Sequence, residues 1–176
     1  MEDKSGSLVS LSANGKTVAI GASYNDGNDF SFSSGHVRIY SFDIGSSAWT
    51  QMGSDIDGKF YGDRSGSSVS LSSDGFTVAI GARSNPTNGY HSGHVRIYSY
   101  DSGSSAWTQM GSDIDGEFSY DESGSAVSLS SDGSTVAIGA PFNDGNGSNS
   151  GHVRIYGFDS GSSTWTQMGS DIDGES

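Results

Sequence analysis

The sequence predicts an all-β protein built from three copies of one unit. The string GHVRIY begins at residues 35, 93 and 151, and WTQMGSDIDG begins at 49, 107 and 165, so both recur every 58 residues. Val, Ile, Thr, Tyr, Phe and Trp recur at short intervals between clusters of Gly, Ser, Asn and Asp, which favours strands joined by tight turns. Repetition at a fixed period is the main guide to the architecture.

Each unit is expected to form four strands, which are clearest in the middle unit. The first alternates Ser with Val69 and Leu71, so one of its faces is apolar. After a tight Ser-Asp-Gly turn, the second strand places Ala79 and Gly81 on one face. That face is small enough for a neighbouring sheet to approach closely. The four expected strands cover residues 67–72, 77–82, 94–100 and 106–112.

A four-stranded antiparallel meander that repeats along a chain is typical of β-propeller blades. The predicted fold is therefore an all-β propeller with three four-stranded antiparallel blades, within residues 1–58, 59–116 and 117–176. A β-trefoil is the alternative, but its three units are shorter and have a different strand pattern.

Residues 123–141, SGSAVSLSSDGSTVAIGAP, resemble the FG-GAP repeat of integrin α-subunit propellers and other extracellular propellers. Ser-Gly at 65–66 and 123–124 stands where the family has Phe-Gly, and GAS, GAR and GAP stand at its Gly-Ala-Pro. The resemblance extends over all three units. It implies a propeller fold and an extracellular or cell-surface location. Calcium-binding members carry an Asp-rich loop between the first two strands, which here is shortened to SANG or SSDG.

The composition argues against several classes of partner. The formal net charge is −13, with 21 acidic against 8 basic residues, whereas nucleic acids and anionic membranes require clustered Lys and Arg. Cysteine is absent, so disulfides and thiolate metal sites are excluded. No apolar run is long enough for membrane insertion, and residues 1–10 do not resemble a signal peptide.

Propellers typically close with four to eight blades, because each wedge-shaped sheet needs neighbours on both faces. Three blades would leave two apolar faces uncovered. The terminal segments DGES and MEDKSG together have the ten-residue length of the connection DGEFSYDESG between blades. We therefore expect head-to-tail homo-oligomers that complete a ring, as a dimer with six blades or a trimer with nine. The alternative is a fragment of a longer propeller.

The loops after the second strand, at residues 23–34, 83–92 and 141–150, differ almost completely among the units, and the inter-blade connections 59–64 and 117–122 also vary. An antiparallel meander places both kinds of segment on one side, as in many binding modules. Aromatic rings among Asn and Asp suit a glycan or a protein ligand, although Asn-Asp-Gly also simply forms turns. The candidate ligand-binding residues are Tyr24, Asn25, Asp26, Phe30, Phe32, Asn85, Asn88, Tyr90, His91, Phe142, Asn143, Asp144 and Asn146.

The repeated DIDG segment places two carboxylates near a predicted turn, which suggests a site for Ca²⁺. Its glycine comes fourth, whereas the EF-hand loop has Gly at its sixth position. We therefore favour a strand-ending turn in which the aspartates accept backbone N–H groups. The candidate calcium ligands are Asp55, Asp57, Asp113, Asp115, Asp171 and Asp173.

Aromatic and cationic residues at fixed repeat positions are expected to pack one blade against the next. Each His of GHVRIY is followed two residues later by an Arg on the same face, which is expected to pair with acids of the outer strand or the adjacent blade. A metal ring of these His side chains would require them near the propeller axis, which the third strand does not approach. The expected packing residues are Trp49, Trp107, Trp165, Arg38, Arg96 and Arg154, with sugar stacking as the alternative for the tryptophans.

Signals of catalysis are missing from the sequence. It contains no G-x-S-x-G, G-x-G-x-x-G or P-loop motif. Potentially catalytic residue types recur in every unit, whereas an active site is normally one asymmetric constellation. The functional hypothesis is a non-catalytic binding or adhesion module without a cofactor. The rival hypothesis is a structural, self-assembling or engineered repeat without a ligand of its own.

Overall fold

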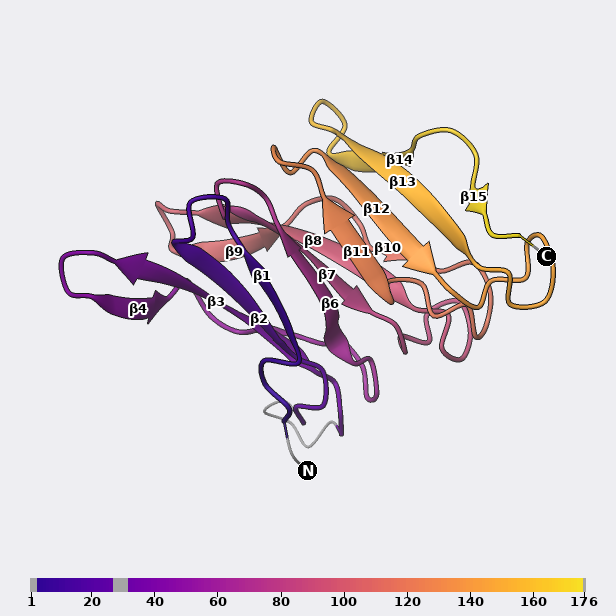
Figure 1. Cartoon of the computed structure of the whole chain (residues 1–176), viewed down its shortest axis with the longest axis horizontal. Coiled ribbons are helices and arrows are strands. Elements are labelled where there is room, and N and C mark those ends of the chain that lie inside the picture. Colours follow the sequence, from indigo (N-terminus) through magenta and orange to yellow (C-terminus); the bar gives the residue numbers. More distant parts are fainter. Residues whose placement is uncertain (1–2, 27–31, 176) are drawn as a thin grey trace.

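The computed structural model of the chain describes residues 3–26 and 32–175, which form fifteen strands and no helix. The strands build three sheets that lie side by side, with the first sheet (indigo to purple) and the third (orange to yellow) on opposite sides of the second (Figure 1). This confirms the prediction of an all-β chain of three antiparallel propeller blades. Among the described residues, no helix has the length and apolar character needed to cross a membrane.

Every blade has the same meander of antiparallel strands. In blade 1 the strands are β1 (Leu8–Leu11), β2 (Thr17–Ala22), β3 (His36–Asp43), β4 (Ala48–Gln51) and β5 (Ile56–Asp57). Blade 2 consists of β6 (Ser65–Leu71), β7 (Thr77–Ala82), β8 (His94–Asp101), β9 (Ala106–Gln109) and β10 (Ile114–Asp115). Blade 3 consists of β11 (Ala126–Leu129), β12 (Thr135–Ala140), β13 (His152–Asp159), β14 (Thr164–Gln167) and β15 (Ile172–Asp173).

The outermost strand differs from its prediction, because it is divided in two. Residues 106–112 were expected to be continuous, but β9 ends at Gln109 and β10 resumes at Ile114, and both pair with β8. Gly111 has a φ of +69°, which ends the extended conformation there. The DIDG segment therefore returns to the sheet and does not form a strand-ending turn, as Ile114 pairs with Val95.

Neighbouring blades approach closely at glycines of the second strand. A Cβ atom on Gly21 would overlap the carbonyl oxygen of Gly66, and one on Gly81 would overlap that of Gly124. The apolar core fills the wedge around these contacts, and each of its two clusters combines side chains from adjacent blades. The core residues include Val37, Ile39, Val78 and Ile80 in the first cluster, and Val95, Ile97, Val136 and Ile138 in the second.

Candidate functional site

The variable segments meet on one side of the blades. Gly35 and Gly93, at the ends of the loops after the second strands, form parallel bridges to Ser65 and Ser123 at the ends of the inter-blade connections. The Tyr120 amide also donates to the carbonyl of Tyr90, at 2.9 Å. We call the surface formed by these loops and connections the variable-loop face.

A hollow of about 360 Å³ lies on this face between blades 1 and 2, and we call it the loop pocket. Three exposed rings lie along it: Tyr61 is 70% exposed, Tyr90 63% and Phe32 50%. The rings of Phe32 and Tyr61 meet edge to face at 6.0 Å, and Tyr90 packs against Tyr120 at 5.5 Å. The remaining residues around the pocket are Ser33, Gly62, Arg64, Ser84, Pro86 and His91.

Polar groups are also available in the loop pocket. The Ser84 hydroxyl is buried and has no hydrogen-bond partner among the described residues. The Arg64 guanidinium lies 5.2 Å from the centre of the Tyr24 ring, and His91 Nδ1 lies 3.7 Å from a carboxylate oxygen of Glu122. The pocket therefore combines apolar ring faces with a cation, an imidazole and an unsatisfied hydroxyl.

The asparagines predicted to contact a ligand instead stabilise the loops. Asn85 is fully buried, and its Nδ2 donates to Asp63 at 2.8 Å while its Oδ1 accepts the Thr87 amide at 2.9 Å. Asn143 donates in the same way to Asp121, at 2.8 Å. These short polar side chains replace missing backbone partners in the turns, so they do not face a ligand.

Other predicted polar residues act similarly. Asn88 and Asn146 each donate to a backbone carbonyl, those of Gly116 and Gly174, at 2.9 Å. Asp144 accepts the Asn149 amide at 2.7 Å. Asp26 accepts the Ser33 amide at 3.0 Å, Asn25 accepts the Gly35 amide through its own carbonyl at 3.0 Å, and Phe30 lies outside the described residues.

Some of the aromatic candidates, unlike the polar ones, lie at the loop pocket. Phe32, Tyr90 and His91 line the loop pocket, whereas Phe142 is 46% exposed on blade 3, away from it. Tyr24 is half-buried beneath the Lys4 ammonium and Arg64. The sequence interpretation missed four residues, although all of them lie in variable segments that it had identified. Tyr61, Arg64 and Tyr120 belong to the inter-blade connections, and Ser84 belongs to the loop 83–92.

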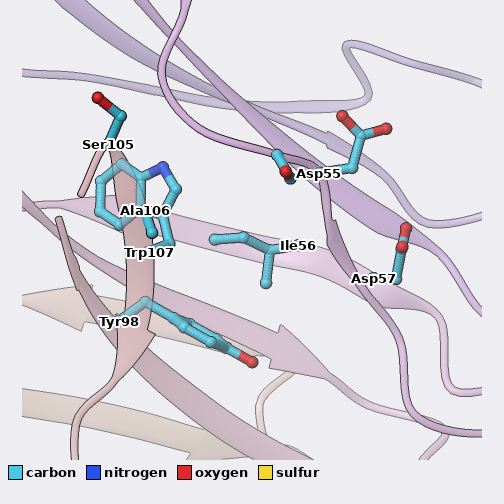
Figure 2. A pocket seen from close by; sticks show the side chains of 8 residues that line it. Asp55, Ile56, Asp57, Tyr98, Ser105, Ala106 and Trp107 are labelled. Atoms are coloured by element: carbon cyan, nitrogen blue, oxygen red, sulfur yellow. The ribbon is translucent and has the colours of Figure 1, made fainter. Parts of the chain in front are cut away.

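A second kind of hollow occurs at the outer rim of both junctions. The first, of about 320 Å³, lies between β5 of blade 1 and blade 2, and Figure 2 shows Trp107 and Tyr98 across from Asp55 and Asp57. Its counterpart of about 330 Å³ lies between blades 2 and 3. The indole nitrogen of Trp107 donates to the Met52 carbonyl at 2.7 Å, so this ring packs the junction. Because the two hollows are built by the same repeat positions, we assign them to blade packing.

The DIDG aspartates lie beside the histidines of the third strand. Three groups have ligand atoms within 4.8 Å of one another: His36, Asp55 and Asp57; His94, Asp113 and Asp115; and Glu117, His152 and Asp171. Each group offers three ligand atoms, whereas Ca²⁺ takes six or more oxygens.

Basic side chains already pair with all three of these groups, the third through Arg154 Nη1, which lies 3.4 Å from a carboxylate oxygen of Glu117. Arg38 Nε donates to Asp55 at 2.9 Å, and Lys59 Nζ contacts Asp113 at 2.8 Å. The expectation that Asp55 and Asp113 accept backbone N–H groups is therefore wrong, because the second part of the outer strand turns these carboxylates towards basic side chains.

Burial gives the middle group unusual protonation. Burial of the ring and repulsion by Arg96 lower the pKa of His94 to about 4, so the imidazole is neutral at pH 7. Burial and the neighbouring Asp113 raise the pKa of Asp115. Neither ring nitrogen of His94 has a hydrogen-bond partner among the described residues.

Residues 113–156 match the FG-GAP repeat family, whereas no curated protein matches the sequence. Solved structures share the fold. A putative 6-phosphogluconolactonase from Bacteroides uniformis has a TM-score of 0.63 at 14% identity, over 95% of this chain and 40% of the other. Saccharomyces cerevisiae Sqt1 has a TM-score of 0.58 at 16% identity, over 99% and 38%. A periplasmic gluconolactonase from Pseudomonas aeruginosa has a TM-score of 0.56 at 15% identity, over 96% and 39%.

The chain thus spans about two fifths of the length of these propeller-like structures, and the likeness at such low identity shows the fold alone. The match over residues 113–156 falls on blades 2 and 3, and the same motifs recur at the corresponding positions of blade 1. The chain thus has a β-propeller fold, and its residues 113–156 match the FG-GAP repeat.

Proposed function

We propose that this chain is a non-catalytic, extracellular or cell-surface binding module that recognises carbohydrate through the loop pocket. The observation that carries the proposal is the row of exposed rings, Phe32, Tyr61, Tyr90 and Tyr120, which spans two blades. Exposing large rings to water is unfavourable, and contiguous exposed apolar surface commonly marks an interaction site.

The chemistry of the pocket suits a sugar. The apolar C–H face of a pyranose stacks on Tyr61 and Tyr90, while its hydroxyls exchange hydrogen bonds with polar groups of the pocket. Ser84 supplies a hydroxyl that lacks a partner among the described residues, and Arg64 supplies fixed donors. With a net charge of −13 on the chain, a neutral glycan is favoured over a polyanionic one.

An enzymatic role has less support. The proteins named gluconolactonases share the fold at 14–15% identity, which is too low to transfer an activity. In this chain, His36, His94 and His152 recur by repetition beside aspartates at blade junctions, as expected for packing groups. Non-catalysis is therefore part of the proposal.

The test is a glycan array followed by titration calorimetry with the best glycan. Replacing Tyr61 or Tyr90 by Ala is expected to weaken binding about tenfold each, because a stacked ring contributes about 1–1.5 kcal/mol. Phe76→Ala is the matched control, since this ring is 46% exposed but lies in the β6–β7 turn, away from the variable-loop face.

The wild type must bind a glycan, and the control must bind it equally well. Failure of the wild type to bind any glycan, or tyrosine variants that bind as tightly as the wild type, would refute the proposal. Selective binding of a peptide in place of a glycan would replace carbohydrate by protein as the ligand. Hydrolysis of gluconolactone by the wild type would refute the non-catalytic part.

A further inference from the structure

The same blade junction is formed twice within the chain. The indole nitrogen of Trp107 in blade 2 donates to the Met52 carbonyl of blade 1 at 2.7 Å. In blade 3, the indole nitrogen of Trp165 donates to the Met110 carbonyl of blade 2 at 2.8 Å. The contact therefore has a direction, in which the later blade provides the donor and the earlier blade the carbonyl.

The arginine of the third strand follows the same direction. Arg96 Nη2 donates to the Asp57 carbonyl at 2.8 Å, and Arg154 Nη2 donates to the Asp115 carbonyl at 3.1 Å. Both residues are buried, at 4% and 5% exposed. Each junction thus buries an arginine against the backbone of the preceding blade.

The inner strands repeat two further contacts. The Leu71 amide donates to the Ser10 hydroxyl, and the Leu129 amide donates to the Ser70 hydroxyl, both at 3.0 Å. At the tips of the first turns, the Ala13 amide donates to the Ser73 carbonyl at 3.0 Å, and the Ser73 amide donates to the Ser131 carbonyl at 2.9 Å. Four kinds of contact therefore define one junction.

The outer face of blade 1 carries the later-blade half of this junction, with its Trp, Arg and Leu donors, and has no partner blade among the described residues. Trp49 is 47% exposed, and the Arg38 side chain is 43% exposed. Arg38 turns back onto Asp55 of its own blade, with Nη2 and Oδ2 2.9 Å apart. Leu11 is 59% exposed, whereas its counterpart Leu71 is 8% exposed at the internal junction.

The outer face of blade 3 carries the earlier-blade half. Met168 and Ile172 are 55% and 57% exposed, whereas Met52 and Ile56, their counterparts in blade 1, are 7% and 6% exposed. Gly139 matches the glycines at which internal blades touch, and a Cβ atom there would meet only Ala126 of its own blade within 4 Å among the described residues. This face therefore has both the apolar surface and the clearance that a further blade requires.

We propose that the outer face of blade 3 binds the outer face of blade 1 of a second copy, head to tail, and so repeats the internal junction. Trp49 then donates to the Met168 carbonyl, and Arg38 leaves Asp55 for the Asp173 carbonyl. At the inner strands, the Leu11 amide of the second copy donates to the Ser128 hydroxyl of the first. At the turn tips, the Ser131 amide of the first copy donates to the Ala13 carbonyl of the second. A second copy is the occupant because the two faces are the halves of one interface that this chain already forms twice.

The association is heterologous, so it closes into a ring if the rotation between copies permits and otherwise extends into a filament. Both outcomes bury the two faces. The net charge of −13 on each copy opposes association at low ionic strength. Because salt screens this repulsion over distances of about 10 Å at 0.1 M, added salt is expected to strengthen the assembly.

Cysteine cross-linking tests the direction of the contact. The chain has no cysteine, and Ala13, Ser73 and Ser131 are exposed turn residues. In the Ala13→Cys, Ser131→Cys double variant, oxidation is expected to link copies into dimers and larger species. The matched control, Ala13→Cys with Ser73→Cys, spans the internal junction and is expected to close within one chain. If the control variant forms its internal disulfide but the test variant does not link separate copies, the proposal is overturned.

Sedimentation equilibrium of single variants provides a second test that does not depend on disulfide geometry. Trp49→Ala on one face and Ile172→Glu on the other are each expected to weaken self-association at least tenfold. Tyr61→Ala, which removes an exposed ring from the loop pocket, is expected to leave it unchanged. If the wild type remains a monomer at high protein and salt concentrations, or if all three variants associate equally well, the head-to-tail interface does not exist.

Discussion

Trp107 and Trp49 occupy the same repeat position in identical AWTQ segments, but they have different surroundings. Trp107 is half-buried and donates to the preceding blade, whereas Trp49 is 47% exposed on the outer face of blade 1. The same contrast separates Val95, which is fully buried, from Val153, which is 37% exposed. A residue in a repeat protein therefore derives its contribution to stability from the neighbouring repeat as much as from its own.

The largest expected effect on the free energy of unfolding comes from placing a methyl group in the narrow space between two blades. Gly81→Ala places a methyl group against the Gly124 carbonyl, so we expect a loss of about 3 kcal/mol or more in the free energy of unfolding. Gly139→Ala, at the corresponding position of blade 3, has 3.5 Å to its nearest neighbour and should change stability by less than about 0.5 kcal/mol.

Urea unfolding of dilute protein measures both values, and equal losses in the two variants would contradict the account of the junction. At higher protein concentration, Gly139→Ala is also expected to weaken self-association, because its methyl group would meet the incoming blade.

The next effect concerns pH and the buried His94. Its pKa of about 4 lies below the ordinary value of 6.5, so the unfolded chain binds this proton more readily than the folded chain. The contribution of His94 to the free energy of unfolding is therefore fully present above pH 6.5. It falls by up to about 3 kcal/mol as the pH is lowered towards 4.

His94→Gln is the comparison for this effect, because it removes the titrating ring. The free energy of unfolding of each protein is to be measured from pH 7.5 to 4. A His94→Gln variant that loses as much stability as the wild type over this range would exclude His94 as the source.

The smallest effect compares the two tryptophans directly. Trp107→Ala removes a half-buried ring and its hydrogen bond, so it should cost about 2–3 kcal/mol. Trp49→Ala should cost less than about 1 kcal/mol in the monomer, because an exposed side chain loses little on truncation. Thermal or urea unfolding of dilute samples provides the comparison, and equal or reversed costs would contradict the difference in packing between the two rings.

The repeat allowed most of the fold to be predicted from the sequence. The period of 58 residues and the alternation of Val69 and Leu71 with serines indicated blades and strands, because both reflect local periodicity. The division of the outer strand was missed, since it depends on the left-handed conformation of Gly111 and on pairing of Ile114 with Val95.

The candidate site was predictable only in part. Loop variability indicated the correct face for Phe32 and Tyr90, but it did not distinguish Asn85, which is buried in a turn, from a ligand-binding residue. Tyr61 was missed because its connection, residues 59–64, was placed on the variable side but the candidate residues were taken only from the loops after the second strands. Identical sequence around Trp49 and Trp107 also hides their difference in burial, which depends on the presence of an adjacent blade.

The mass of the wild-type chain in solution tests the central claim most directly. Sedimentation equilibrium at increasing protein and salt concentrations should give species that are multiples of 18.2 kDa, with the association strengthened by salt. Such a result would be expected if the exposed faces of blades 1 and 3 are two halves of one junction. A single species of 18.2 kDa under all of these conditions would contradict that claim.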